Sequence, residues 1–521
     1  MTLSFKRDWP AAALVVATAI LIVPLWCVRT PAMPDLPAHL AGFYLIAGGA
    51  ETAPVSTYYA VHWHLLPNLA SEIVVPLLAR VTSLDSAARL FLSIAVAMWV
   101  LGPAAIQRAL TGRLGPAPLA GALFAYNANF TWGFLNYYFA AGLSFLGFAA
   151  WIAAGKRRTP TVLAAFAVGA FALYVCHLFG ACLLAVMIAS YELAAAWRER
   201  AAGLKAWTGR ALPVVLVFLP AALAFLLFKV RGGAVGDIEF NYSDTMGDRV
   251  GSLMQWYFGE PAYLPIGGLL IAVFAGLLYG LIRFRAAMKL PVLGIAALAL
   301  VSPEWAFGGW GVDLRLPAVL GALVFASLEP RLSSTWNAAV AAVLLLTAGV
   351  SADAIADNWR SRDRQYGEFR AALGEVPEGA KIFTVLDGDA LDDTADQPYW
   401  HMAEFAIIDR GAFTPLMFTT RGQHVVQPKQ PYDALAAATA QQGSPPDVTE
   451  LSDLAAGRVK NDPDIEESYP YLKFFRCHFD LAVVVTGEGE PSDVPSFMTL
   501  RHAGSFFSIY DIRPPRTCAK P

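Results

Sequence analysis

Long apolar segments separated by short polar connections dominate the first two thirds of the chain. Several of them are near the roughly 20 residues that a helix needs to cross the hydrocarbon core of a bilayer. The pattern predicts a polytopic α-helical membrane domain over residues 1–354, with about 11 transmembrane helices. The apolar segments lie at about 10–28, 86–106, 115–132, 134–154, 160–176, 178–197, 211–229, 263–282, 289–302, 314–328 and 335–353.

Every second connection between these segments carries Lys or Arg. Cytoplasmic loops are enriched in these residues, so the alternation predicts a multi-pass protein of the bacterial inner (cytoplasmic) membrane with a cytoplasmic N-terminus. Residues 30–85 and 230–262 then form two long external loops, and the C-terminal tail is periplasmic. The basic connections contain Arg108 with Arg113, residues 156–158, residues 198–210, residues 283–289, and Arg331.

The first apolar segment could be a membrane anchor or a cleaved signal peptide. Its apolar stretch of about 18 residues is longer than the usual signal-peptide core of about 7–15 residues. No clean cleavage site of small residues follows it. We therefore expect a retained anchor.

The first external loop contains apolar residues at helical spacing over residues 65–78. This spacing predicts a helix that lies along the membrane interface or dips into it. Tyr58, Tyr59 and Trp63 stand beside it and are of the type that favours the headgroup level. The segment fits an interfacial anchor and a substrate-binding element equally well.

The chain becomes more polar after about residue 354. Strand-like runs occur at 381–386, 479–486 and 505–512, and residues 399–408 and 432–442 have the pattern of helices. We expect an extracytoplasmic soluble α/β domain over residues 355–521, joined by a polar helix at about 355–373. Cys477 and Cys518 both fall in this domain, where an oxidising compartment permits a disulfide, and the sequence leaves their pairing open.

Composition agrees with a membrane protein and argues against one class of partner. The 521 residues are 56% hydrophobic and 15% charged, with a mean hydropathy of +0.49. The formal net charge is −3, and the Lys and Arg residues are scattered among short loops. Because nucleic-acid binding needs a basic surface, we expect no nucleic-acid partner.

An acid and a histidine follow the first apolar segment, as Asp35 and His39 in Asp-Leu-Pro-Ala-His. Ionisable groups at a membrane boundary are costly to keep and suggest a functional site. In a helix the two side chains share one face, so Asp35 could act as a general base while His39 orients it, shares its proton or binds a metal. The alternative is that Asp35 caps an external helix that has Pro37 in its first turn.

The arrangement resembles the GT-C class of membrane glycosyltransferases. One span, a long first external loop opening with an acid, about ten further spans and an external α/β domain carry the resemblance. The segment from Pro34 to Leu40 also resembles an Asp-x-Pro-x-His-Leu signature of bacterial relatives, as do residues 133–137 and 313–317. The resemblance implies a sugar donor carried on polyprenyl phosphate, and an acid, here Asp35, that is the catalytic base or a metal-site residue.

Many members of this class have a second acid beside the first, whereas Asp35 has no acidic neighbour. The nearest acids along the chain are Glu51 and Glu72. No metal ligand is therefore assigned, and no cofactor is certain. A divalent cation, Mg²⁺ or Mn²⁺, is the cofactor that the resemblance leaves open.

External cations are candidates for the donor phosphate. Arg315 stands in the short loop before the tenth span, and Lys229 and Arg231 stand at the outer end of the seventh. Arg makes bidentate phosphate contacts, and Asp313 could hold or partly neutralise Arg315. The alternatives are an ordinary interfacial ion pair and snorkelling of the cation to the membrane surface.

Other polar and aromatic residues are candidates for substrate contact. His62 and His64 alternate, so an extended backbone would place both on one side. Asn136 and Tyr137 begin the fourth apolar segment, and Trp305 stands in the loop before Asp313. Aromatic girdles of membrane proteins use the same residue types. Residues 399–404 of the tail could either face the membrane site or fill the core of their own domain.

Together with these features, the resemblance to the GT-C class implies a membrane glycosyltransferase, with inverting hexosyl or pentosyl transfer expected. It would move a sugar from a polyprenyl-phosphate donor to an extracytoplasmic glycan, lipid or protein acceptor. One alternative is a non-catalytic glycolipid-binding or scaffold protein of the same fold. A transporter is another, but it would predict paired half-repeats, and none is evident in the sequence.

Overall fold

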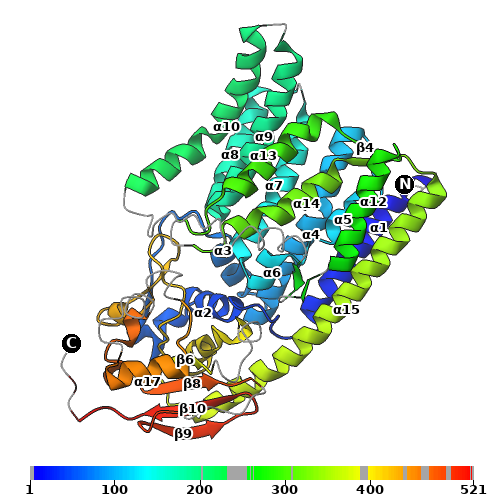
Figure 1. Cartoon of the computed structure of the whole chain (residues 1–521). Coiled ribbons are helices and arrows are strands. Elements are labelled where there is room, and N and C mark those ends of the chain that lie inside the picture. Colours follow the sequence, from blue (N-terminus) through cyan, green and yellow to red (C-terminus); the bar gives the residue numbers. More distant parts are fainter. Residues whose placement is uncertain are drawn as a thin grey trace.

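The computed structural model shows a long helical bundle with a smaller, mixed α/β part at one end (Figure 1). This arrangement confirms the expected fold class. The structure describes residues 5–155, 157–200, 203–230, 255–257, 260–261, 263–306, 309–387, 397–437, 443–458, 469–487, 494–516 and 518.

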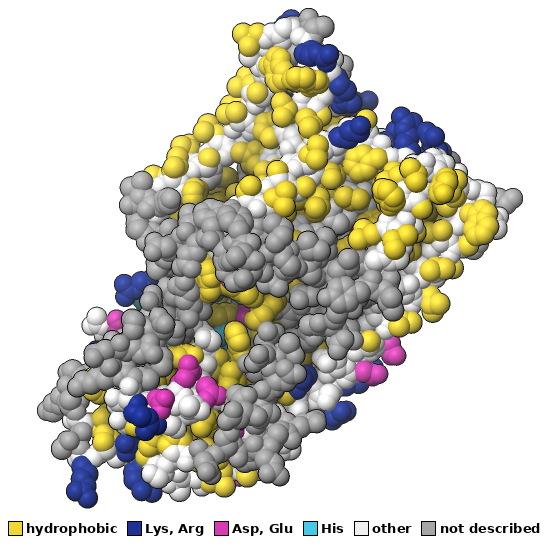
Figure 2. Space-filling model, in the orientation of Figure 1, with side chains coloured by type: hydrophobic (Ala, Val, Ile, Leu, Met, Phe, Trp, Pro, Cys, Tyr) yellow, Lys and Arg dark blue, Asp and Glu magenta, His cyan; other side chains and the backbone are white. Residues whose placement is uncertain are grey.

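Ten of the predicted apolar segments form single helices in the described part of the chain. Within the residues that the structure describes, six helices are long and apolar enough to cross a membrane, among them α1, α4 and α15. Hydrophobic side chains cover this part of the surface (Figure 2). The ten helices are α1 (Phe5–Trp26), α4 (Leu84–Thr111), α7 (Leu135–Ala154), α8 (Pro160–Cys176), α9 (Leu178–Arg198), α10 (Leu204–Val230), α12 (Tyr263–Leu278), α13 (Lys289–Val301), α14 (Leu316–Ala326) and α15 (Ser334–Ala372).

The predicted segment at 115–132 differs from the others because it is divided into two short helices, α5 (Ala117–Ala122) and α6 (Ala128–Trp132). Asn127 is the N-cap of the second helix and separates it from the first. Its side chain accepts a hydrogen bond from the Asn129 backbone N–H and donates one to the Phe124 carbonyl. This capping geometry competes with a continuous helix.

Small residues let α4 and α7 pack closely at the centre of the bundle. A Cβ added to Gly102 would lie 2.6 Å from the Phe145 Cβ, and one added to Gly142 would lie 2.8 Å from the Met98 Cβ. Close backbone approach at small residues is the usual way in which helices associate in a membrane, where the hydrophobic effect does not drive helices together.

Several of the basic connections meet at one end of the bundle. Strand β4 (Ile282–Phe284) pairs with β5 (Leu328–Pro330), and the Gln107 side chain donates to the Leu328 carbonyl. Arg158 and Arg210 both contact Glu192, which joins two further basic connections. The described parts of these connections therefore lie together, as their alternation along the chain predicted.

The first long loop folds at the opposite end. It contains α2 (Leu36–Ile46), two short 3₁₀ helices (Gly49–Glu51 and Val55–Thr57), β1 (Tyr59–Val61) and α3 (Ala70–Leu78). The predicted interfacial helix thus begins later than expected, at Ala70. Of the second long loop, only the short strands β2 (Gln255–Tyr257) and β3 (Glu260–Pro261) are described, so its predicted role lies outside the described residues.

The tail contains a four-stranded sheet in the order β6-β8-β10-β9. Strand β6 (Ile382–Leu386) is parallel to β8 (Leu481–Val485), which is antiparallel to β10 (Phe507–Ile512). These three strands match the predicted ones, whereas β9 (Met498–Ala503) was not predicted. In the region predicted as a helix at 399–408, α16 (Phe405–Arg410) begins later than expected. The region predicted at 432–442 contains a 3₁₀ helix (Tyr432–Leu435), and residues 438–442 lie outside the described residues. Helices α17 (Val448–Ala456) and α19 (Phe475–His478) were not predicted.

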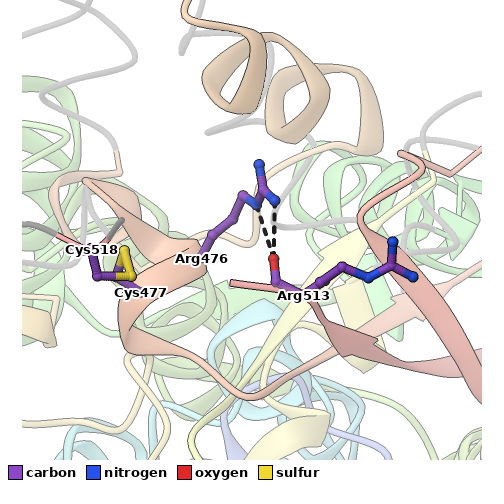
Figure 3. The surroundings of a disulfide bond; sticks show 4 residues. All are labelled: Arg476, Cys477, Arg513 and Cys518. Carbon is purple, nitrogen blue, oxygen red and sulfur yellow. Dashed lines mark hydrogen bonds between the residues drawn. A yellow bond between two sulfur atoms is a disulfide. The ribbon is translucent and has the colours of Figure 1, made fainter. Parts of the chain in front are cut away.

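Cys477 and Cys518 form a disulfide with their Cα atoms 5.7 Å apart, which answers the question that the sequence left open. Close to it, the Arg476 guanidinium donates two hydrogen bonds to the Arg513 carbonyl, at 3.2 and 3.0 Å (Figure 3). The disulfide and these bonds tie α19 to the chain that leaves β10.

The first loop and the tail share one core. Strand β1 pairs with β7 (Val426–Pro428) of the tail. The Tyr59 hydroxyl donates to the Thr414 carbonyl at 3.0 Å, and both residues are buried. Helix α15 also runs without a break from the bundle into the tail. The tail is therefore attached to the loop that carries Asp35.

Candidate functional site

A cavity of about 920 Å³ lies where the helical bundle meets the tail. Its walls come from α2, the start of α7, the turn between α8 and α9, the end of α10, the loop before α14 and the tail. Figure 2 shows histidine and acidic atoms on the floor of a recess between these two parts. The volume is in the range of small-molecule binding pockets.

Asp35 lines the cavity and occupies the N-cap position of α2, but its side chain makes no capping hydrogen bond. Its backbone N–H donates to the Trp132 carbonyl at 3.1 Å, which fixes the residue from the main chain alone. The capping alternative therefore does not account for the carboxylate. Burial raises the pKa of Asp35 to about 6, although the charges of His401 and Arg315 oppose this rise.

Gly133 explains how Asp35 is accommodated. Its φ of +97° is in the left-handed region, and an added Cβ would lie 3.0 Å from the Asp35 Cβ. A side chain at this position would be strained and would press on the acid. The segment at 133–137, which carries part of the family resemblance, thus has a physical role beside Asp35.

Three histidines surround Phe418 on the cavity wall. The ring centroids of His39, His401 and His424 lie 5.0, 4.8 and 5.4 Å from that of Phe418. Burial lowers the pKa of His39 to about 3, with contributions from the other two histidines, and lowers that of His424 to about 4. His39 and His424 are therefore neutral at pH 7.

Arg315 is a buried cation with few hydrogen bonds. Its Nη2 donates to the Trp310 carbonyl at 3.0 Å, and among the described residues its buried Nε has no partner. Aromatic rings of Phe134, Tyr137 and Phe179 surround the guanidinium at 5.0 to 5.4 Å. Burial lowers its pKa to about 10, so it stays charged at neutral pH.

Two hydrogen bonds hold the backbone around Arg315. The Tyr137 hydroxyl donates to the Arg315 carbonyl at 2.5 Å, and the Asn129 side chain donates to the Leu314 carbonyl at 3.3 Å. The guanidinium is thereby fixed on the cavity wall with hydrogen-bonding capacity left over. Because a buried cation with unused donors is costly, this geometry favours an anionic ligand.

The other predicted phosphate contacts are placed less centrally. Asp313 is buried and contributes a charge near Arg315, but it does not line the cavity. Lys229 lies in the last turn of α10, and its side chain lies outside the described residues. Arg231 is outside them altogether.

The predicted substrate contacts divide into two groups. Asn136, Tyr137 and Trp305 line the cavity. Asn136 uses its side chain for structure, since it bonds to the Ser71 N–H and to the Glu72 carboxylate at 2.6 and 2.8 Å. His62 and His64 are exposed and do not line the cavity.

Several cavity residues were missed by sequence reasoning or left open there. His177 lines the cavity, and its Nδ1 accepts the Phe179 N–H at 3.1 Å. This bond leaves the Nε2–H as a donor. His401 and Trp400 belong to the tail segment whose orientation was open, and both line the cavity. No pattern along the sequence distinguished His424.

A divalent cation does not fit the described residues. Among them, no group of three or more His, Cys, Asp or Glu side chains could hold a metal ion. Glu72 already bonds to Ser71 and Asn136, and Glu51 is exposed. Mg²⁺ and Mn²⁺ prefer several oxygen ligands, carboxylates above all. Among the described residues, no such group of ligands forms around Asp35.

The cavity thus presents an acid and an unsatisfied cation to one space. Asp35 and Arg315 both line it, and the charge of each shifts the pKa of the other. Phe179 of α9 and Phe225 and Phe228 of α10 extend the wall with apolar rings. The arrangement can remove a proton at one side and stabilise negative charge at another.

Comparison with known proteins gives a structural likeness but no match of sequence. No family model and no curated protein matches the chain. The chain is similar to ArnT from Cupriavidus metallidurans in a crystal structure bound to undecaprenyl phosphate. The identity is 13%, the match covers 98% of each chain, and the TM-score is 0.49. A likeness at this level assigns neither a family nor an activity to the chain.

Proposed function

We propose that this chain is a membrane glycosyltransferase that moves a sugar from a polyprenyl-phosphate donor to an acceptor hydroxyl. The observation that carries the proposal is the pair formed by Asp35 and Arg315 on the wall of one cavity. The carboxylate makes no capping hydrogen bond to α2, and among the described residues the Arg315 Nε has no partner. The class of donor comes from the resemblance of the segment around Asp35 to the GT-C class.

In this reaction the acceptor oxygen forms a bond to the anomeric carbon while the bond from that carbon to the phosphate oxygen breaks. The bonding electron pair leaves with the phosphate, and the acceptor proton passes to Asp35. Arg315 stabilises the phosphate charge, and the His177 Nε2–H is a second donor near it. Attack from the side opposite to the phosphate gives inversion.

Apolar and aromatic surfaces of the cavity suit the rest of the donor. Phe225 and Phe228 belong to α10, whose exposed surface is mainly apolar, and an isoprenoid chain would lie there. The Trp132 ring lies 4.9 Å from that of Trp310 and 5.8 Å from that of Trp400, which makes an aromatic wall for a sugar. The basic connections gather at the opposite end of the bundle, so the cavity faces the periplasm.

The test is sugar transfer by the purified protein in nanodiscs, with a panel of polyprenyl-phosphate sugars and cell-envelope acceptor extract. Asp35→Asn should lower transfer by about 10²- to 10⁴-fold while donor binding is retained, because a general base contributes this much. Asp85→Asn is the matched control. Asp85 pairs with Arg29 at 2.7 Å outside the cavity, so its loss should leave transfer unchanged.

Two outcomes would contradict the proposal. Full transfer by Asp35→Asn would exclude this acid as the base. No transfer by the wild type, with specific donor binding, would instead favour a glycolipid-binding or scaffold protein, the alternative that the lone acid at Asp35 leaves open.

A further inference from the structure

The tail places a histidine between two carboxylates at the edge of the cavity. His401 Nε2 lies 4.0 Å from Asp35 Oδ1, and His401 Nδ1 lies 3.9 Å from Glu404 Oε1. His401 and Glu404 are 4% and 1% exposed. Both ring nitrogens therefore face an acid, one from the loop and one from the tail.

The fold holds this row of three residues in place. His401 precedes a 3₁₀ turn (Met402–Glu404) that leads into α16, and both of these elements pack against α2. The edge-on ring of Phe418 lies between His401 and His39. Helix α2 carries Asp35 at its start, so the tail packs against the element that bears the proposed base.

Glu404 is buried although its carboxylate makes no hydrogen bond to the described residues. A buried and unpaired carboxylate is strongly disfavoured unless a positive charge lies near it. Within the described part of the chain, His401 is the only ionic partner of Glu404.

We propose that His401, held protonated by Glu404, is a positioning residue for Asp35. The inference rests on the proposed function of Asp35 as a base. The imidazolium keeps the Asp35 carboxylate ionised and turned toward the cavity, ready to accept the proton of the attacking hydroxyl. The first loop therefore supplies the base, and the tail supplies the charge that keeps it active.

The charges around Asp35 are consistent with this role. Burial lowers the pKa of His401, but the carboxylates of Glu404 and Asp35 outweigh burial and leave it above its ordinary value. His39 and His424 face the same region and are neutral at pH 7 because burial lowers their pKa values. Arg315 is the other cation that acts on Asp35.

The first experiment compares the pH dependence of kcat/KM for the wild type, His401→Asn and Glu404→Gln. Loss of a nearby opposite charge raises the pKa of an acid by about 1 unit or more. The acid limb should therefore move to higher pH by about that amount in His401→Asn, and in the same direction but less in Glu404→Gln. Donor affinity should stay at the wild-type value in both variants.

The tail contains a matched control pair. His502 Nδ1 lies 3.0 Å from Glu375 Oε1, and neither residue lines the cavity. His502→Asn and Glu375→Gln remove the same chemical groups from the same part of the protein. They should leave the pH profile and the rate unchanged.

The second experiment does not depend on activity. Nuclear magnetic resonance of labelled histidine in the full chain, with His401→Asn for assignment, should show the His401 ring titrating above pH 6.5, the ordinary value for histidine. Its pKa should fall in Glu404→Gln and in Asp35→Asn. A wild-type His401 that titrates below 6.5, and that does not respond to either acid, would overturn the inference.

The two proposals can fail separately. If the wild type transfers sugar and Asp35→Asn does not, an unshifted acid limb in both His401→Asn and Glu404→Gln overturns the positioning role and leaves the function standing. If the wild type does not transfer sugar, the function fails. The titration then still decides whether the charge of His401 depends on Glu404 and Asp35.

Discussion

Two buried ionic sites near opposite ends of helix α9 are built in different ways. Glu192, near the end of the helix, is 2% exposed. Its carboxylate contacts Arg158 at 2.7 Å and Arg210 at 3.0 Å, and it accepts a hydrogen bond from the Trp151 indole N–H at 2.8 Å. At the start of the helix, the Asp35 carboxylate lies 4.0 Å from His401, and Arg315 bonds to the Trp310 carbonyl while its Nε has no partner among the described residues. Glu192 is paired within the protein, whereas the charges at the cavity keep hydrogen-bonding capacity for a ligand.

The charge of Glu192 is structural, whereas we expect the charges of Asp35 and Arg315 to be functional. A buried ion pair that is complete adds little chemistry, and removing one of its partners mainly costs stability. A buried charge that lacks partners costs stability from the start and is retained for its chemistry. Changes at the two sites should therefore affect different measurements.

The largest effect on activity outside Asp35 is expected at Arg315. Arg315→Gln should lower kcat/KM by about 10²- to 10³-fold, as loss of a preorganised group that stabilises transition-state charge does. Arg315→Lys should recover only part of the loss, because Lys cannot make a bidentate contact. Steady-state kinetics with a polyprenyl-phosphate sugar measures both.

Arg29→Gln is the control for Arg315. Arg29 is an exposed arginine that pairs with Asp85 away from the cavity. Equal kinetics for Arg315→Gln and Arg29→Gln would show that the cavity cation has no part in catalysis.

At the other end of α9, Glu192→Gln should act on stability. The change leaves two arginines without their shared carboxylate and should lower the free energy of unfolding by about 3 kcal/mol. The specific activity of the folded protein should not change. Asp35→Asn should show the reverse, with an unchanged or raised melting temperature and little transfer; thermal unfolding in detergent compares the two variants.

A pH profile gives the next effect. Because the pKa of Asp35 is raised to about 6, the carboxylate is ionised above that pH and can accept a proton. Transfer should fall by about tenfold for each pH unit below it, since only the ionised fraction reacts. A rate that stays constant from pH 7 to pH 4.5 would contradict the role of Asp35.

Of the four predicted effects, that of Gly133→Ala should be the smallest. An alanine in the left-handed region costs about 1–2 kcal/mol, and here its Cβ would also press on the Cβ of Asp35. We expect a several-fold loss of activity together with a lower melting temperature. Gly169→Ala, in α8, is the control, because an added Cβ there meets nothing within 4 Å.

The sequence was informative where structure follows from local pattern. The apolar segments and the alternating basic connections predicted that Asp35, Asn136 and Arg315 would lie at the same end of the bundle, and all three line the cavity. The three central strands of the tail were also visible in its apolar runs. The break at Asn127 was missed because that segment is apolar on both sides of the cap.

What the sequence could not supply was contact between distant segments. Nothing in the spacing of His401 indicates that it reaches Asp35, because that contact depends on how the tail packs against α2. The pairing of β1 with β7 is likewise invisible in short strands of ordinary composition. The separation of the exposed His62 and His64 from the cavity follows from the same long-range packing.

Because the first loop and the tail share one core, the cavity can be completed only after the tail has been synthesised. The bond between Tyr59 and Thr414 joins residues 355 positions apart. At about 5–20 residues per second, synthesis of that interval takes roughly 20 to 70 s. During this time the nascent chain has Asp35 but not the tail segments that complete the cavity, so under the proposed function we expect no sugar transfer by a ribosome-bound chain.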